Sequence, residues 1–360
     1  GLIHAAGMIM KFAFADVVAE TSSHGDMENV DGRLTVVVAF DAGFQLHDKA
    51  CWRWIERWLL LDPSRIHLTL LHVARAKHVE AHLELTSYRY LNLEDCSRYL
   101  PYDVWKNLKK RKYPSNEVLV LTTTSSVSTA ILQYMQYDAP AHSLLVLGGR
   151  HERSTSVIPR FLMGSVSTDV VTKISSHPVL LIRTRLFEDV TDLRTDTIGA
   201  AYLGVDRKPS EDEIVRGRGR FVCIAVDADH VKSLVHYCRR EILRKTDVVQ
   251  IIHCAADEHP STIARVSKEV EDVRVEMETF LDDKTQLDSV LLDFSGDIRD
   301  KIVDHCREMQ PQLDMLVIGN RVTRRLTRAI IGSTAQYILQ HAHVPVYMVP
   351  DHLLECMEAA

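Results

Sequence analysis

The chain carries the same series of features twice, and this repeat restricts its possible folds more than any other feature. A Gly-Ser pair at 164–165 recurs at 332–333, 168 positions later, and the Pro-Val pair that begins at Pro178 recurs at Pro345, 167 positions later. A near-constant offset at matching landmarks indicates an internal duplication. A chain of 360 residues is also too long for one ordinary core. We therefore expect two related domains.

Both copies contain five short apolar runs of the kind that form strands buried on both faces of a parallel sheet. In the first copy they are Leu34–Phe40, His67–Val73, Val118–Leu121, Leu144–Gly148 and His177–Ile182, and in the second Phe221–Val226, Val248–Cys254, Val290–Leu292, Met315–Gly319 and Val344–Val349. Helical patterns separate the runs, as at 128–137, 231–238, 261–282 and 298–309. The alternation predicts the α/β class: two doubly wound, Rossmann-like domains, each a five-stranded parallel sheet flanked by helices.

The repeat also predicts the domain boundaries. They divide the chain into a tail at 1–32, a first domain at 33–185, a linker at 186–218, a second domain at 219–350 and a C-terminal tail at 351–360. The first domain has an insertion at 76–116 that is rich in Tyr, Leu and charged residues. The linker region ends in the basic run Arg216–Arg220, for which a mobile surface segment is as good an interpretation as a specific role.

Composition restricts the classes of partner. Hydrophobic residues make up 46% and charged residues 26% of the chain, which is typical of a soluble globular protein. The net charge of -6 argues against a nucleic-acid partner, and no apolar run is long enough to span a membrane. The seven cysteines are scattered and form no CxxC pair, which predicts a reduced, cytoplasmic protein.

No dedicated catalytic machinery is expected. The sequence contains no HExxH, no Walker lysine motif and no ordered Ser-His-Asp set. His72 and His253 follow apolar pairs at equivalent strand positions, and we interpret them as satisfied core residues. His341 and His343 have a spacing that could chelate a metal, but they lack a third ligand nearby, so no metal site is predicted.

The order of features resembles the universal stress protein family, here in tandem. The resemblance rests on a strand ending in Asp, a strand ending in His and a small residue, and a strand ending in Gly, then on a loop, a Gly-Ser pair and a final Pro-Val strand. Its most specific segments are 164–182 and 332–349. It implies a fold of the adenine nucleotide alpha hydrolase type that commonly dimerises through its last strand. A tandem chain could form that pair internally as a pseudo-dimer, with a homodimer as a further option.

Nucleotide-binding members of the family carry G-x2-G-x9-G-[S/T] after the fourth strand. In the second copy Gly319 and Gly332 have the required spacing and Ser333 follows, but Val322 occupies the middle glycine position. Glycines let the backbone approach phosphates, and the following helix offers free N–H groups and its positive dipole end. A branched side chain at 322 opposes that approach.

The resemblance also implies roles for further residues of the second copy. Asp227 would meet the adenine or ribose, the Cys254 backbone would border the base, and Thr334 follows the Gly-Ser pair. Arg321 and its neighbours Arg324, Arg325 and Arg328 could neutralise phosphates or form a solvated basic face. A strand-end cap is the equal alternative for Asp227, and helix N-capping is the alternative for Ser333 and for Ser165 in the first copy.

The first copy is the weaker candidate site. Gly148 and Gly164 are 16 positions apart, three more than the motif requires. Only Gly164, Ser165 and Val166 match its distal half, while Asp41 and Val73 match the base-side positions.

Three functions therefore remain open. The first is a stress-response or signalling module that binds ATP or AMP, with Mg²⁺ accompanying ATP, and that hydrolyses ATP slowly at most. The second is a family member that binds no nucleotide and acts through a protein partner. The third is an enzyme of a related α/β class, for which no second catalytic motif is present.

Overall fold

The computed structural model of the chain describes part of the sequence. The described residues are 34–40, 52, 54–55, 59, 66–75, 87–91, 116–123, 125–149, 165–183, 219–254, 260–283, 286–292, 297–309, 313–320 and 332–358.

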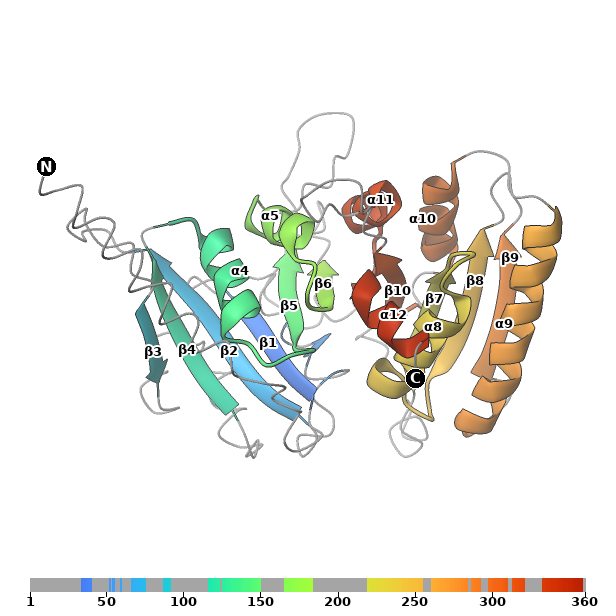
Figure 1. The fold of residues 1–360 in the computed structure, drawn as a ribbon, viewed down its shortest axis with the longest axis horizontal. Helices are drawn as coiled ribbons and strands as arrows, with labels where there is room; N and C mark the ends of the chain where they lie inside the picture. Colours follow the sequence, from blue (N-terminus) through green and yellow to red (C-terminus); the bar gives the residue numbers. More distant parts are fainter. Residues whose placement is uncertain are drawn as a thin grey trace, which may run out of the picture.

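All strands of the described residues belong to one sheet, in the order β3-β4-β2-β1-β5-β6-β11-β10-β7-β8-β9 (Figure 1). The strands of the first half are β1 (Leu34–Phe40), β2 (Ile66–Arg75), β3 (Ser87–Leu91), β4 (Asn116–Thr123), β5 (Leu144–Gly149) and β6 (Val179–Arg183). Those of the second half are β7 (Phe221–Val226), β8 (Val248–Cys254), β9 (Leu287–Leu292), β10 (Met315–Asn320) and β11 (Val346–Pro350). The predicted strands are confirmed, with small shifts at their ends.

The two halves have the same strand order and the same register. The order is β4-β2-β1-β5-β6 in the first half and β9-β8-β7-β10-β11 in the second, and neighbours within each series are parallel. Phe40 lies opposite His72 in the first half, and Val226 lies opposite His253 in the second. The fold is therefore a mixed α/β fold built on one large, mostly parallel sheet.

Helices cover both faces of this sheet, because successive strand residues point to opposite sides. One face packs against α4 (Val127–Tyr137), α5 (Ser165–Lys173), α10 (Ile298–Glu308) and α11 (Ser333–His341). The other packs against α8 (Val231–Tyr237), α9 (Pro260–Phe280) and α12 (Asp351–Glu358), and in the first half against Trp52, Trp54 and Ile55. A π-helical turn, η3 (Cys238–Ile242), follows α8.

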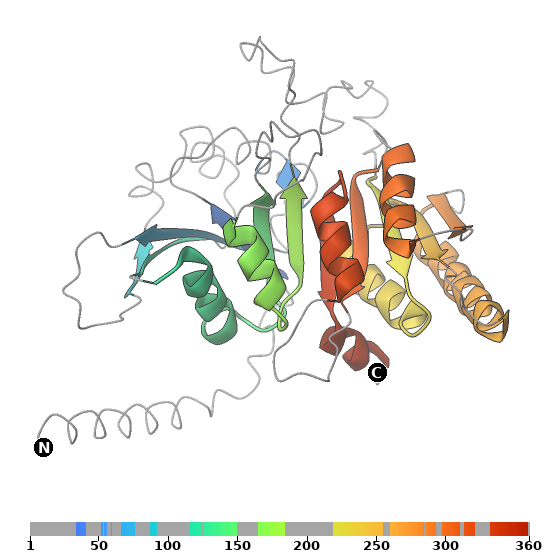
Figure 2. The same ribbon diagram turned by 90° about the horizontal axis from the view of Figure 1, so that it is seen from above.

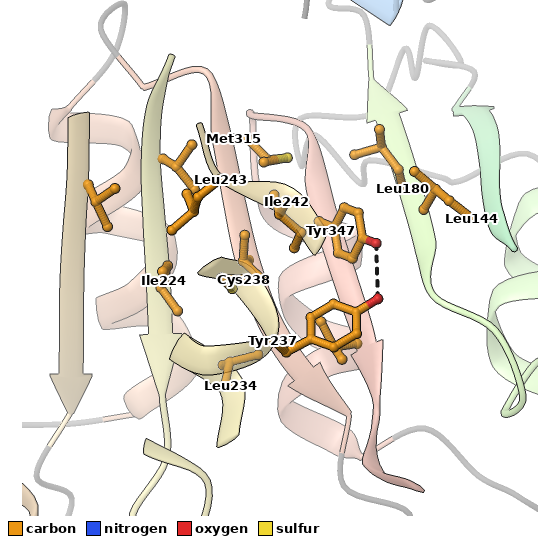
Figure 3. Close-up of a cluster of buried hydrophobic side chains, with 14 of the residues drawn as sticks. Leu144, Leu180, Ile224, Leu234, Tyr237, Cys238, Ile242, Leu243, Met315 and Tyr347 are labelled. Carbon is orange, nitrogen blue, oxygen red and sulfur yellow. Dashed lines mark hydrogen bonds between the residues drawn. The ribbon is translucent and has the colours of Figure 1, made fainter. Parts of the chain in front are cut away.

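The halves join where β6 pairs antiparallel with β11, a junction that we call the seam (Figure 2). Leu180 lies opposite Tyr347 in this register, and both side chains belong to a core cluster that continues across the seam. Figure 3 shows Tyr347 between Leu180 of the first half and Tyr237 of α8, whose hydroxyl lies 3.3 Å from that of Tyr347. Burial raises the pKa of both phenols, so the pair stays neutral inside the core.

Two elements of the described structure were not predicted. β3 lies in the insertion at 76–116 and pairs antiparallel with β4, so the first half does not have a purely parallel five-stranded sheet. Its sequence, SYRYL, has the aromatic content that favours strands, and it covers what would otherwise be an open sheet edge. The expected C-terminal tail contains α12, because buried Leu353 and Leu354 anchor this segment to the core.

The second half begins with a buried ion pair. Arg220, the last residue of the basic run predicted to end the linker, is buried and contacts Asp247 through Nη2 at 2.6 Å. Asp247 also accepts hydrogen bonds from the backbone N–H groups of Arg220 and Arg244. A Cβ on Gly219 would lie 1.5 Å from the carbonyl oxygen of Thr246, so only glycine fits there. The start of β7 is thus fixed to the start of β8.

Arg220→Ala is expected to lower the free energy of unfolding by about 3–5 kcal/mol, because it leaves the Asp247 carboxylate buried without its partner. Urea unfolding measures the loss, and the double variant Arg220→Met with Asp247→Leu should recover part of it, since both charges are gone. The matched control is Arg240→Ala, which removes an exposed pair with Glu241 and should cost less than about 1 kcal/mol. Equal losses in the two single variants would contradict the prediction.

Candidate functional site

The candidate site lies at the edge of the sheet where the parallel strands of the second half end. β7 ends at Val226, β8 at Cys254, β10 at Asn320 and β11 at Pro350. The registers place Val226 beside His253 and Asn320 beside Pro350. The residues that follow these strands are therefore neighbours, and this is the edge at which doubly wound sheets bind ligands.

Asp227 directly follows β7 and organises the turn into α8. Its Oδ1 accepts hydrogen bonds from the backbone N–H groups of Asp229, at 2.9 Å, and His230, at 3.0 Å. This agrees with the strand-end cap interpretation. The carboxylate is also 38% exposed, so part of it remains accessible from solvent.

His230 links two strand ends, a role that the sequence analysis missed. Its Nδ1 lies 3.2 Å from Asp227 Oδ1, and its Nε2 lies 3.2 Å from Oδ1 of Asp351, the first residue of α12. The ring thus lies between the carboxylates that follow β7 and β11, with a hydrogen bond to Asp227 at Nδ1. The sequence contains a signal for this contact. An acidic residue directly follows each of the two strands, Asp227 after β7 and Asp351 after β11, and His230 lies three positions after Asp227.

Gly319 and Asn320 end β10 and have separate structural roles. A Cβ on Gly319 would lie 3.3 Å from Cδ1 of Leu354, so the glycine makes room for α12. Asn320 is buried, and its Oδ1 accepts a hydrogen bond of 3.2 Å from the N–H of Gly332. This contact holds the beginning of α11 at the end of β10. The sequence analysis did not single out Asn320, although a polar residue that ends an apolar strand is an available signal.

The start of α11 contains the second Gly-Ser pair. Gly332 is the N-cap, in an extended conformation with φ -56° and ψ 142°, and it makes no side-chain capping bond. Ser333 is the first helical residue and is exposed, while Thr334 is half-buried. The N-capping interpretation of Ser333 is therefore wrong, because the cap lies one residue earlier. An exposed hydroxyl and the first N–H groups of the helix lie together at this point.

The predicted site residues are only partly described. Arg321 and Val322, together with the other loop arginines, lie outside the described residues, as do Asp41 and Gly164. Cys254 is the last residue of β8, and its backbone is placed beside Leu292 of β9. Asp227, Gly319, Gly332, Ser333 and Thr334 are gathered at one edge of the sheet.

The first half offers fewer matching features. Val73 lies in β2 and Gly148 in β5, while Ser165 begins α5 and Val166 packs partly buried against the core. The carbonyl of Gly148 accepts a hydrogen bond of 3.0 Å from Ser167 Oγ, so this strand end is tied to the first turn of α5.

The strand histidines have the same structural role in both halves. His72 Nδ1 lies 3.3 Å from the carbonyl oxygen of Phe40, and His253 Nδ1 lies 3.1 Å from that of Val226. Both side chains are buried. Since a carbonyl can only accept, each Nδ1 carries the proton. The interpretation of these two residues as satisfied core histidines is confirmed.

The described part of the chain contains no group of three or more His, Cys, Asp or Glu side chains arranged to hold a metal ion. No helix within it combines the length and apolar character needed to cross a bilayer.

Comparison with family models gives a match in the second half of the chain. Residues 222–350 match the model of the universal stress protein family. The universal stress protein match runs from the second residue of β7 to the last residue of β11, and so contains the whole candidate site except α12 and Asp351. No curated protein matches the chain in sequence.

Solved structures show the same fold over nearly the whole chain. A protein of Pseudomonas aeruginosa UCBPP-PA14 named for the universal stress proteins has a TM-score of 0.56 at 16% identity, with 92% of this chain and 99% of that chain covered. A functionally unknown protein of Pseudomonas aeruginosa PAO1 has a TM-score of 0.54 at 16% identity, with 92% and 98% covered. At this identity the likeness concerns the fold alone.

His253→Leu is expected to lower the free energy of unfolding by about 1–3 kcal/mol, because the buried carbonyl of Val226 loses its donor. Chemical denaturation measures the loss, and His72→Leu should behave alike because its bond is equivalent. As a control, His236→Leu removes a partly exposed contact with Glu276 and should cost less than about 1 kcal/mol. A cost for His253→Leu no larger than that of the control would refute the structural role.

Proposed function

We propose that this chain is a tandem universal stress protein, with two doubly wound domains, whose second domain binds an adenine nucleotide, ATP or AMP. The observation that carries the proposal is the hydrogen bond between Asn320 and Gly332. It holds the N-terminus of α11 at the end of β10, beside the end of β7, so that a helix dipole and exposed donors converge on one sheet edge.

In this proposal the phosphates lie at the start of α11. The first N–H groups of a helix have no partner within it and bind anions readily. Ser333 adds an exposed hydroxyl, and the half-buried Thr334 adds another hydroxyl. By resemblance to the family motif, Gly319 and Arg321 would contact the nucleotide from the loop that precedes α11. A Mg²⁺ ion would accompany ATP as part of the ligand.

The base and ribose lie at the ends of β7 and β8. The exposed part of the Asp227 carboxylate is an acceptor for ribose hydroxyls or an adenine amino group, and the Cys254 backbone borders the base. The weaker first-half site would use Asp41, Val73, Gly148, Gly164, Ser165 and Val166. The second half is the better site because Gly319 and Gly332 have the motif spacing, whereas Gly148 and Gly164 lie three positions too far apart.

We infer a binding protein rather than an enzyme, with slow ATP hydrolysis at most. His230 lies near the proposed base side, but both of its ring nitrogens face carboxylates, so it does not offer a free base to activate water. The seam supports an internal pseudo-dimer, because the last strand of each half pairs with the other. A cytoplasmic location, and a homodimer of the whole chain, are parts of the same proposal.

One observation favours a second candidate, a protein-interaction module that binds no nucleotide. Gly319 packs against Leu354, and Asp227 organises the α8 turn, so both motif residues have structural reasons to be present. In that case the partner would be another protein, and Val322 would close the phosphate loop.

ATP and AMP are expected to raise the melting temperature of the chain, by an amount that corresponds to about 2.7 kcal/mol at a ligand concentration of 100 times Kd. Ser333→Ala should weaken binding about tenfold, since it removes one donor to a charged group, and Gly332→Val should abolish it. Gly164→Val in the first half is the matched control and should leave the main shift in place. Isothermal titration calorimetry supplies the affinities, and no shift with either nucleotide would refute the proposal.

Val322→Gly separates the two candidates. The substitution restores the middle glycine of the motif and should tighten ATP binding, because it removes a branched side chain from the loop. If the unchanged protein binds ATP and the variant binds it more tightly, the nucleotide proposal stands. If only the variant binds ATP, the natural chain is the interaction module.

A further inference from the structure

The Asp227 carboxylate is held in one orientation by several donors. Its Oδ1 accepts hydrogen bonds from the backbone N–H groups of Asp229 and His230 and from the ring Nδ1 of His230, which lies 3.2 Å away. The same Nδ1 lies 3.4 Å from Oδ2. Because an ionised carboxylate can only accept, Nδ1 carries a hydrogen. The side chain is thus fixed through Oδ1 while part of it stays exposed at the candidate edge.

The ring that makes this bond is attached to a fixed backbone. His230 is the N-cap of α8, and its carbonyl oxygen accepts a hydrogen bond of 3.0 Å from the N–H of Leu234. Its own N–H donates to Asp227. The side chain makes no capping bond to the helix and is 15% exposed. The largely buried ring therefore serves Asp227 rather than the first turn of α8.

The other side of the ring meets α12. Oδ1 of Asp351 lies 3.2 Å from Nε2 of His230, and the Asp351 side chain is 16% exposed. This oxygen is buried and accepts no aligned hydrogen bond from the described residues, so it meets the ring through charge and packing. Leu353 and Leu354, buried in the core, fix the helix that carries it. The ring is therefore enclosed between carboxylates that follow two different strands.

α12 also packs against the end of β10, where the motif loop begins. A Cβ on Gly319 would lie 3.3 Å from Cδ1 of Leu354. The segment that matches the family model ends at Pro350, so α12 lies directly after it. One short helix outside the matched segment thus contacts the strand end at Gly319 and, through His230, the strand end at Asp227.

We propose that His230 and Asp351 are positioning residues, which hold the Asp227 carboxylate ready to accept a hydrogen bond from the nucleoside part of a bound adenine nucleotide. The inference rests on the proposed function, in which the base and ribose lie at this strand end. The donor is a ribose hydroxyl or the adenine amino group, which are the hydrogen-bond donors that adenosine carries.

The physical gain is one of conformational entropy. A side chain that becomes immobile only when the ligand binds lowers the affinity, by about two- to tenfold for one side chain. In this chain the immobilisation has already occurred on folding, because the turn and the His230 ring fix Asp227 beforehand. A supporting shell of this kind keeps a binding group in its productive geometry.

Isothermal titration calorimetry of the full chain with three nucleotides identifies the donor. They are ATP, 2′,3′-dideoxy-ATP, which lacks both ribose hydroxyls, and inosine triphosphate, which lacks the adenine amino group. The unchanged chain should bind one analogue about tenfold more weakly than ATP, because that analogue lacks the donor to a charged group. The analogue that is weak shows whether Asp227 takes the ribose or the base. Equal affinities for all three would overturn the proposal.

Variants then test the two positioning residues. His230→Ala removes the ring bond but keeps the backbone bond, and should weaken ATP about two- to tenfold. It should leave the affinity for the weak analogue nearly unchanged, since that ligand makes no bond to Asp227. Asp351→Ala should act in the same direction but less, because the ring keeps its bond. His230→Asn offers an amide N–H near the place of Nδ1 and should restore most of the ATP affinity.

Two matched controls lie nearby and should bind all three nucleotides as the unchanged chain does. His236→Ala, on the same helix as His230, removes a contact with Glu276, and Asp272→Ala removes a carboxylate that pairs with Lys232.

The outcomes separate this inference from the proposed function. An unchanged ATP affinity in His230→Ala, or equal losses for ATP and the weak analogue, would overturn the inference while the proposed function stands. An unchanged affinity in Asp351→Ala would remove Asp351 from the role, and this variant decides if His230→Ala does not fold. No binding of any nucleotide by the unchanged chain would refute the proposed function, and this inference with it.

Discussion

The antiparallel pairing of β6 with β11 is the interaction on which the rest of the structure depends. Each half is an α/β unit whose last strand would otherwise present an open edge with unpaired N–H and C=O groups. Pairing these two edges joins the halves into one sheet and extends the core across the seam, with Leu180 against Tyr347. The two α/β halves thereby share a single sheet.

The same pairing determines what surrounds the candidate site. Because the two strands are antiparallel, the end of β11 lies beside the beginning of β6, and the segment before β6 lies beside the candidate edge of the second half. α12 begins at this junction, directly after β11, and its first residue, Asp351, lies 3.2 Å from Nε2 of His230. α12 is therefore connected to Asp227 through one intermediate residue, His230.

Much of the fold could be predicted from the sequence, because strands buried in a parallel sheet are continuous apolar runs. In this chain the runs of the first half also recur in the second half at a nearly constant offset. The paired histidines were also predictable, since His72 and His253 follow equivalent apolar pairs. β3 and α12 were not predicted, because short segments without an apolar run take their structure from the partner they cover. At the candidate site the spacing of Gly319 and Gly332 identified the loop, but it carried no information about Asn320 or Leu354.

The sequence by itself determined the strands of each half, because their positions follow from local periodicity and from the repeat. Only the tertiary structure decided that Asp227 caps a turn, that His230 joins it to Asp351, and that Gly319 makes room for α12. The last two roles depend on contacts between residues far apart in the chain, with 121 positions separating His230 from Asp351. Such contacts exist only once the sheet is assembled and its strand ends meet.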